Sequence, residues 1–406
     1  MTIDVLVLNT LAVDYRLRGD EGSWIEGLVG EGGLAKCARE ALPKHCDEQQ
    51  SQEWIKQGKT TAGGPGNCAP LIARAGLKVA VVGNLGSGNF DGLDATGRFF
   101  YDTMAKNNVD MSNIFIHPTL PSGRSFIHEI SKDERGGIAY FPLANDDFDF
   151  NRCKVALARL KPKIVHYMYS GLSERADRNG GRDLADFIQW GVEQDIITLV
   201  DTHTHTGKPK EAIKSGKALW QYSLLEPVLK AVDLFFCSYA EARMIANTLP
   251  ALRDKGINRL TTEIEFCYQF LEWLQRYHLQ SSRSRLFGVT VKDGAYFRVG
   301  KPGISIKREK VKTNFMTREK INLVGAGDAF RAGLLAYTTQ HMDEFRRGTM
   351  DYRKAIQMGN LFAALYIKAP LHDRYSLIAD YEQMLRVVRD EKTYTTLSDL
   401  KAALGK

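Results

Sequence analysis

The sequence predicts an α/β fold built around a mostly parallel sheet. Short apolar runs rich in β-branched residues recur along the chain, and each has the length of a buried strand. Helical segments separate these runs. Strand 163–171, helix 182–194 and strand 196–201 form one such unit, and two strands that are joined in this way are parallel. The other expected strands are 3–9, 78–83, 233–237 and 286–291.

Length and composition are those of an ordinary globular protein. The 406 residues suffice for one large domain or two, and 44% of them are hydrophobic and 25% charged. The net charge of +7 is modest, and no long run of lysine or arginine occurs, so nucleic-acid binding is not expected. A mildly basic surface suits an anionic substrate.

The cysteines and the apolar runs indicate the compartment. The 6 cysteines are scattered without a CxxC pair, which argues against a zinc ribbon or a disulfide scaffold and favours free thiols in a reducing compartment. No signal peptide opens the chain, and no stretch is long and apolar enough to span a bilayer. We therefore expect a cytoplasmic protein without a membrane partner.

The strongest candidate for chemistry is the turn formed by Gly325, Ala326, Gly327 and Asp328, which opens the helix that includes 330–337. Glycines at a helix start let the backbone approach a ligand closely, and the first N–H groups have no partner within the helix. Together with the helix dipole, these donors suit a phosphate. A carboxylate beside them makes sense if a hydroxyl must lose its proton near a transferring phosphoryl group, so Asp328 is predicted to be a general base.

Two further positions are candidates for binding an acceptor. Asp14 follows the first expected strand, and open α/β sheets bind ligands at the carboxyl ends of their strands. Asn67 follows Gly63 and Gly64, and its amide can donate and accept hydrogen bonds at once, as the vicinal hydroxyls of a sugar require. Capping of a helix is the competing interpretation for both side chains, and for Asp14 so is a solvated carboxylate in a loop.

These motifs resemble those of the ribokinase-like (PfkB) family of carbohydrate and nucleoside kinases. The string GAGDAF-x-x-G at 325–333 resembles the C-terminal signature of the family. Gly63, Asn67 and Ala69 match its first signature, with Ala62 in place of the first glycine. The motifs occur in the family's order along nearly the whole chain.

The resemblance implies a single domain over 1–406. Its core would be a doubly wound, mostly parallel sheet with helices on both faces, and a small β-sheet lid would be formed within about 15–61 and 117–145. The expected lid strands are 123–130 and 137–141, which read as a hairpin. Residues 16–60 look like an insertion, with a helical stretch at 34–42.

The resemblance also implies an activity, which is ATP-dependent phosphorylation of a hydroxymethyl group of a sugar, or of a nucleoside. Asp328 would be the base, and Gly325, Ala326 and Gly327 would form the anion hole. The other implied ligands are a magnesium ion held through water by Glu241, and a monovalent cation is left open. The acceptor would bind Asp14, Gly63, Gly64 and Asn67, and the nucleotide Thr290, Gly294 and Asn360. A homodimer formed through the lid is left open as well.

The chain departs from the family pattern on the metal and phosphate side. Asn322 and Leu323 stand where the family has Asp-Thr, and Ser238 replaces an asparagine. The loop 290–294 is one residue shorter, with Lys292 for its middle glycine. These departures keep open a non-catalytic, ligand-binding descendant of the fold.

A metal hydrolase is the remaining alternative. In the run from Asp201 to His205, the His-x-His spacing projects His203 and His205 from one side of an extended strand, as a metal pair requires. This reading predicts stoichiometric zinc. The motif ends the first strand of amidohydrolase barrels, whereas about 200 residues precede it in this chain.

Overall fold

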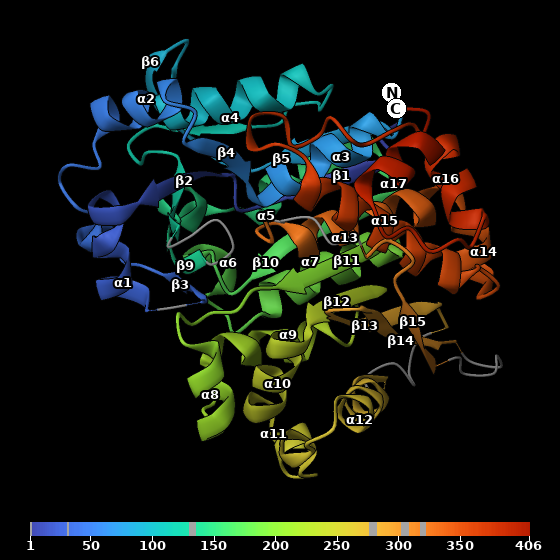
Figure 1. The fold of residues 1–406 in the computed structure, drawn as a ribbon. Coiled ribbons are helices and arrows are strands. Elements are labelled where there is room, and N and C mark those ends of the chain that lie inside the picture. The colour runs from blue at the N-terminus through green and yellow to red at the C-terminus, as the bar shows by residue number, and fades with distance from the viewer. Residues whose placement is uncertain (1, 31, 130–134, 276–281, 302–307, 317–321) are drawn as a thin grey trace.

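The computed structural model describes residues 2–30, 32–129, 135–275, 282–301, 308–316 and 322–406. A large sheet of eight strands forms the body of the molecule, and a second sheet of five strands lies beside one end of it (Figure 1). The large sheet comprises β1 Val5–Leu8, β5 Val79–Val82, β10 Ile164–Ser170, β11 Ile197–Thr202, β12 Leu234–Ser238, β13 Arg285–Val291, β14 Gly294–Gly300 and β15 Arg308–Lys312. The second sheet comprises β2 Ala12–Arg18, β3 Leu34–Lys36, β4 Thr60–Gly63, β8 Gly123–Glu129 and β9 Arg135–Phe141. A two-stranded sheet is formed by β6 Asn84–Phe90 and β7 Phe115–His117.

The large sheet is mostly parallel, as predicted. Its order is β15-β14-β13-β12-β11-β10-β1-β5, and only the pairs β13–β14 and β14–β15 are antiparallel. Successive side chains of a strand point to opposite faces. In β1, Val5 and Val7 belong to one hydrophobic core, while Leu6 and Leu8 belong to another. The sheet is therefore buried on both faces, which explains why its strands read as continuous apolar runs.

Helices cover both faces of the large sheet (Figure 1), which confirms the doubly wound arrangement. The core on the side of Val5 takes side chains from α3 Ala69–Arg74, α13 Ala326–Gln340, α14 Met342–Arg347, α15 Tyr352–Lys368, α16 Tyr381–Arg389 and α17 Leu397–Ala403. The core on the side of Leu6 takes side chains from α5 Phe150–Leu160, α6 Glu174–Asp177, α7 Arg182–Glu193, α8 Pro209–Ser215, α9 Leu225–Val228, α10 Tyr239–Thr248, α11 Pro250–Arg253 and α12 Glu263–Gln275.

The second sheet has the order β3-β9-β8-β2-β4 and carries its own helices. The predicted hairpin is confirmed, since β8 and β9 pair antiparallel; residues 130–134 between them lie outside the described part. The helices are α1 Ser23–Val29, α2 Glu48–Lys56 and α4 Ala95–Lys106. Tyr15, Trp54 and Phe126 form an aromatic cluster in this unit, with ring centroids 5.2–5.9 Å apart.

The prediction of a helical stretch at 34–42 is wrong. Leu34 to Lys36 form β3, which pairs parallel with β9, and only Arg39 to Ala41 make a single turn of 3-10 helix. The alanines and charged residues of this stretch favour a helix locally, but pairing with β9 and burial of Leu34 override that preference. Residues 16–60 thus largely belong to the second sheet and to the helices that pack on it.

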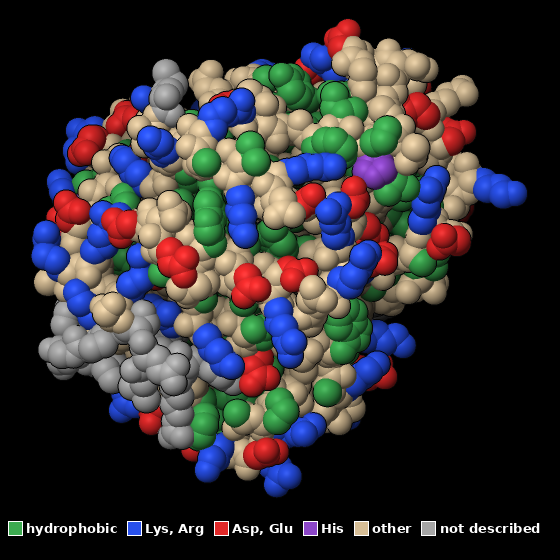
Figure 2. Space-filling model, turned by 180° about the vertical axis from the view of Figure 1, so that it is seen from behind, with side chains coloured by type: hydrophobic (Ala, Val, Ile, Leu, Met, Phe, Trp, Pro, Cys, Tyr) green, Lys and Arg blue, Asp and Glu red, His purple; other side chains and the backbone are tan. Residues whose placement is uncertain are grey.

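The surface and the thiols agree with the composition. On the face shown in Figure 2, basic and acidic side chains are interspersed. All 6 cysteines are free, as predicted. Within the described ranges, no helix combines the length and the apolar character needed to cross a membrane.

Candidate active site

The candidate site lies between the second sheet and the carboxyl ends of the large sheet's strands, where α13 begins. A cavity of about 60 Å³ marks it. Its lining residues are Thr10, Ala12, Asp14, Leu34, Gly64, Asn67, Ser125, Ile138, Tyr140, Tyr169, Leu172, His203, Val324, Gly325 and Asp328. Five of the predicted site residues (Asp14, Gly64, Asn67, Gly325 and Asp328), which are far apart in the sequence, thus share one cavity.

Gly325 is the residue that permits the turn before α13. Its φ is +84°, and a Cβ there would lie 2.8 Å from Cε1 of Tyr366 and 2.9 Å from Cγ of Asn67. The N–H of Ala326 donates to the Leu323 carbonyl over 3.1 Å and is used by the turn itself. In the described residues, the N–H groups of 327 and 328 have no backbone acceptor, so these two point out of the helix end as free donors.

Asp328 is buried and receives hydrogen bonds on both of its oxygens. Oδ2 accepts from the Tyr169 hydroxyl over 2.6 Å and from Nδ2 of Asn67 over 3.1 Å, while Oδ1 accepts from Nη1 of Arg331 over 3.2 Å. Burial raises the pKa of Asp328 to about 6, against the lowering effect of the Arg331 charge. The carboxylate is therefore a stronger base than an exposed aspartate.

Arg331 links Asp328 to a second buried carboxylate. Its Nε lies 3.1 Å from Oδ2 of Asp201, which also contacts Nε2 of His166 at 3.1 Å. Asp201 and His166 have no exposed surface. Burial alone would raise the pKa of Asp201, but the charges of Arg331 and His166 outweigh it and lower that pKa. Asp201 therefore stays ionised and fixes the guanidinium that contacts Asp328.

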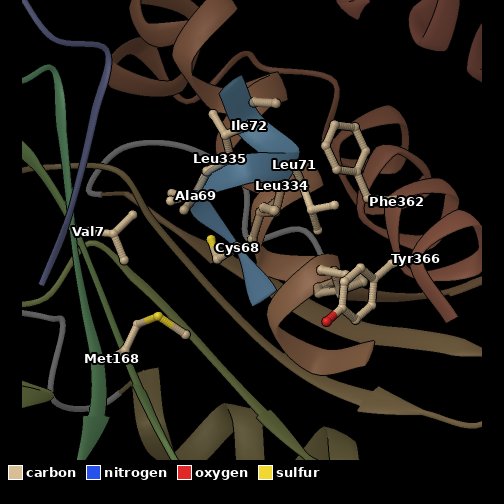
Figure 3. Packing of buried hydrophobic residues seen from close by; sticks show 14 of the residues in the cluster. Val7, Cys68, Ala69, Leu71, Ile72, Met168, Leu334, Leu335, Phe362 and Tyr366 are labelled. Atoms are coloured by element: carbon tan, nitrogen blue, oxygen red, sulfur yellow. The ribbon is translucent and has the colours of Figure 1, made fainter. Parts of the chain in front are cut away.

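The orientation of the Asn67 amide is fixed by a hydrogen bond from Tyr366. Its Oδ1 accepts from the Tyr366 hydroxyl over 2.5 Å, so its Nδ2 faces Asp328. Figure 3 shows Tyr366 of α15 beside the segment that leads from Cys68 into α3. Arg374 stacks 4.0 Å from the Tyr366 ring centroid and donates to the Val324 carbonyl over 2.9 Å. Asn67 and the turn before α13 are thus supported by the same pair of side chains.

Asp14 reaches the cavity from β2, in the second sheet, with Thr61 and Ser125 opposite it on the neighbouring strands. Burial raises its pKa to about 6. A Cβ at Gly63 would lie 2.4 Å from Asp14 Oδ1, so a larger residue there would displace this carboxylate. At Gly64, with φ +55°, a Cβ would lie 2.1 Å from the Thr10 carbonyl oxygen.

The residues expected to bind nucleotide lie outside the cavity. Thr290 pairs in register with Ser238, and its hydroxyl donates to the Cys237 carbonyl over 3.4 Å. Gly294 has φ +143° at the tight turn between β13 and β14. Asn360, on α15, donates to Oε1 of Gln357 over 3.1 Å.

Glu241 forms a capping box at the start of α10. Its Oε2 accepts from the Ser238 N–H over 2.7 Å, and the Ser238 hydroxyl accepts from the Glu241 N–H over 3.3 Å. Burial raises the pKa of Glu241. In this structure Glu241 therefore caps α10.

The geometry does not favour a metal hydrolase. β11 ends at Thr202, and His205 has φ +52°, so the two histidines do not share one side of an extended strand. His205 is buried against Thr202, with Nε2 2.8 Å from its hydroxyl, and burial lowers its pKa to about 3. His203 lines the cavity next to Tyr169. In the part of the chain that the structure describes, no three metal-binding side chains are grouped to hold an ion.

The sequence predictions do not include Tyr169 and Arg331, which contact Asp328, or Tyr366 and Arg374, which support Asn67 and the turn before α13. Arg331 could have been found, because it is a cation three residues after Asp328 on an otherwise apolar helix. Tyr169 reads as one more core residue of a strand. Tyr366 and Arg374 carry no local signal, since only the fold brings them to Asn67.

Neither a protein-family model nor a curated protein sequence matches the chain. Solved structures do. An adenosine kinase from Schistosoma mansoni, in complex with 2-fluoroadenosine, matches with TM-score 0.62 at 15% identity, over 90% of this chain and 95% of that chain. A probable sugar kinase from Rhizobium etli CFN 42 gives TM-score 0.61 at 17% identity, over 91% and 94%. A PfkB protein from Polaromonas sp. JS666 gives TM-score 0.57 at 15% identity, over 94% and 99%.

The chain has the ribokinase-like fold. The predicted resemblance is thereby confirmed at the level of architecture, including the small sheet beside the doubly wound one. Open α/β sheets bind ligands in the crevice at the carboxyl ends of their parallel strands. The cavity around Asp328 occupies this position.

Proposed function

We propose that the protein is an ATP-dependent kinase that transfers the γ-phosphoryl group to a hydroxymethyl group of a sugar. The observation that carries the proposal is Asp328, a buried carboxylate that lines a small cavity and stands beside two free N–H groups at the start of α13. A base for the acceptor and donors for the phosphoryl group are the parts that this reaction needs. A nucleoside is the second candidate acceptor, because an adenosine kinase is among the similar structures.

In the proposed reaction, the acceptor oxygen bonds to the γ-phosphorus while the bond from that phosphorus to the β–γ bridging oxygen breaks. ADP leaves with the electron pair, and Asp328 takes the proton of the acceptor hydroxyl. The N–H groups of Gly327 and Asp328 stabilise charge on the transferring group, and such donors contribute about 3–4 kcal/mol each in other enzymes. The N–H of Ala326 remains in its turn.

The remaining predicted residues position the two substrates. Asp14 and Asn67 hold hydroxyls of the acceptor, against the backbone of Gly63 and Gly64. The nucleotide lies along Thr290, Gly294 and Asn360. Glu241 would contact magnesium through a water at Oε1, and the cation would neutralise charge between the nucleotide phosphates.

A ligand-binding protein without catalytic activity is the competing function. The capping box ties one oxygen of Glu241 to the backbone, and Asn322 accepts from the Val324 N–H over 3.1 Å rather than offering a charge. This alternative predicts a magnesium-dependent shift in melting temperature on addition of ATP, without turnover.

Activity is expected to fall on the acid side of pH 6. Asp328 must be ionised to accept a proton, and its pKa is raised to about 6, so kcat/KM decreases about tenfold per pH unit below that value. Asp14 has a similar pKa, and Asp14→Asn is therefore the control. The decrease in kcat/KM at acid pH is expected to persist in this variant. If it disappeared in the variant, or if the wild-type profile stayed flat down to pH 5, the group that titrates would not be Asp328.

The test of the function is ADP formation with magnesium and a panel of sugars, sugar phosphates and nucleosides, with Asp328→Ala as the negative variant. The kinase is supported by turnover on one acceptor class that the variant loses. Nucleotide binding without turnover on any class would favour the ligand-binding protein.

A further inference from the structure

Tyr169, near the end of β10, places its hydroxyl on the candidate base. The hydroxyl donates to Oδ2 of Asp328 over 2.6 Å, compared with 3.1 Å for the bond from Asn67 to the same oxygen. A neutral hydroxyl that donates to Asp328 is what the proposed reaction requires of its acceptor. The phenol therefore occupies the position of the acceptor hydroxyl.

A bulge in β10 turns the side chain toward Asp328. The register with β11 shifts between Tyr167 and Ser170, and the φ of Tyr169 is +62°, a strained value for an aromatic residue. As a result Tyr169 packs in the same core as Met168, whereas regular alternation would place it with Tyr167 in the opposite one. The Tyr169 N–H donates to Oδ1 of the buried Asp201 over 2.6 Å, which holds this conformation.

The ring also lines the small cavity beside Asp328. Tyr169 is 7% exposed, and its ring meets the His203 ring edge-on at 5.1 Å. The cavity beside it measures about 60 Å³, whereas pockets for small molecules are on the order of several hundred Å³. Binding of a sugar or a nucleoside thus requires the lining of this cavity, to which Tyr169 belongs, to rearrange.

We propose that Tyr169 determines acceptor specificity by competing with the acceptor for Asp328. A single hydroxyl, as in water, gains no more at Asp328 than the phenol already provides. An acceptor with several hydroxyls displaces the phenol, because Asp14 and Asn67 bind its other hydroxyls at the same time. The inference rests on the proposed function, and it names polyhydroxylated acceptors over water or simple alcohols.

The test is a double-mutant cycle on acceptor binding, measured by calorimetry without nucleotide for wild type, Tyr169→Phe, Asp328→Asn and the double variant. The probes are D-ribose, D-fructose, adenosine and glycerol. Tyr169→Phe keeps the ring and removes the competing hydroxyl, so we expect about tenfold tighter binding, the size of one hydrogen bond to a charged group. In the Asp328→Asn background we expect the same change to be less than twofold, because the charged acceptor of the phenol is gone.

The outcomes show whether the Tyr169 hydroxyl competes with the acceptor for Asp328 or has another role. Weaker binding by Tyr169→Phe would mean that the hydroxyl holds the acceptor, and equal effects in both backgrounds would mean a purely structural role; either overturns the proposal. Failure of every probe to bind both wild type and Tyr169→Phe overturns it as well. Tyr296→Phe is the matched control. The Tyr296 hydroxyl donates to Glu263 on α12, so this substitution is expected to leave acceptor binding unchanged. Phosphoryl transfer by wild type is measured separately, so its absence would refute the kinase without deciding the cycle.

Discussion

Replacing Asp328 with asparagine is expected to lower kcat by about 10²–10⁴-fold, because an amide cannot take the proton of the acceptor hydroxyl. Asparagine has nearly the same shape and can still accept from Tyr169 or Asn67, so the cavity should persist. The measurement is steady-state turnover with the acceptor that the panel identifies.

Asp233→Asn is the matched control for this substitution. Asp233 is another buried carboxylate whose pKa is raised by burial, but it lies at the amino end of β12, where it accepts from the Thr198 N–H over 3.0 Å. Its replacement is expected to leave kcat within about twofold of wild type. An Asp328→Asn enzyme that retained a tenth or more of wild-type kcat would show that Asp328 is not the base.

Replacing Arg331 with methionine is expected to lower the free energy of unfolding by about 3–5 kcal/mol, because two buried carboxylates lose their shared cation. Loss of that charge also raises the pKa of Asp328 and of Asp201. The acid limb of kcat/KM should therefore move to higher pH. Urea denaturation and a pH profile measure the two effects.

Arg98→Met is the control for stability, since Arg98 pairs with Asp91 and Asp102 on the surface and its loss is expected to change stability little. Arg331→Lys should restore only part of the effect, because an ammonium cannot bridge two carboxylates as a guanidinium does. An Arg331→Met protein as stable as Arg98→Met, with an unmoved acid limb, would contradict the role assigned to this cation.

The parts of the fold that depend on local patterning could be predicted from the sequence. The parallel strands are apolar runs because both faces of the large sheet are covered, and Gly325 stands where the turn requires φ +84°. The prediction of a helix over 34–42 failed because β3 pairs with β9, which lies about 100 residues further along the chain, and no local sequence pattern reveals that pairing.

The candidate site was predictable only in part, for a related reason. Asn67 and Asp328 lie at helix starts and Asp14 lies within β2. Each of these polar residues can be recognised by its place in a motif. Tyr169 reaches Asp328 because a bulge breaks the alternation of side chains between the two faces of β10. No pattern in the sequence predicts this bulge. Arg374 reaches the turn before α13 through its bond to the Val324 carbonyl, which only the packed structure specifies.

The most direct test of the account is transfer of label from γ-³²P ATP to the acceptor, with the position of the phosphate assigned by NMR. We predict a labelled product that carries the phosphate on a hydroxymethyl oxygen, formed by wild type and reduced by at least about a hundredfold in Asp328→Asn. Label that appears only as inorganic phosphate, or equal label transfer by both proteins, would contradict the proposed kinase mechanism.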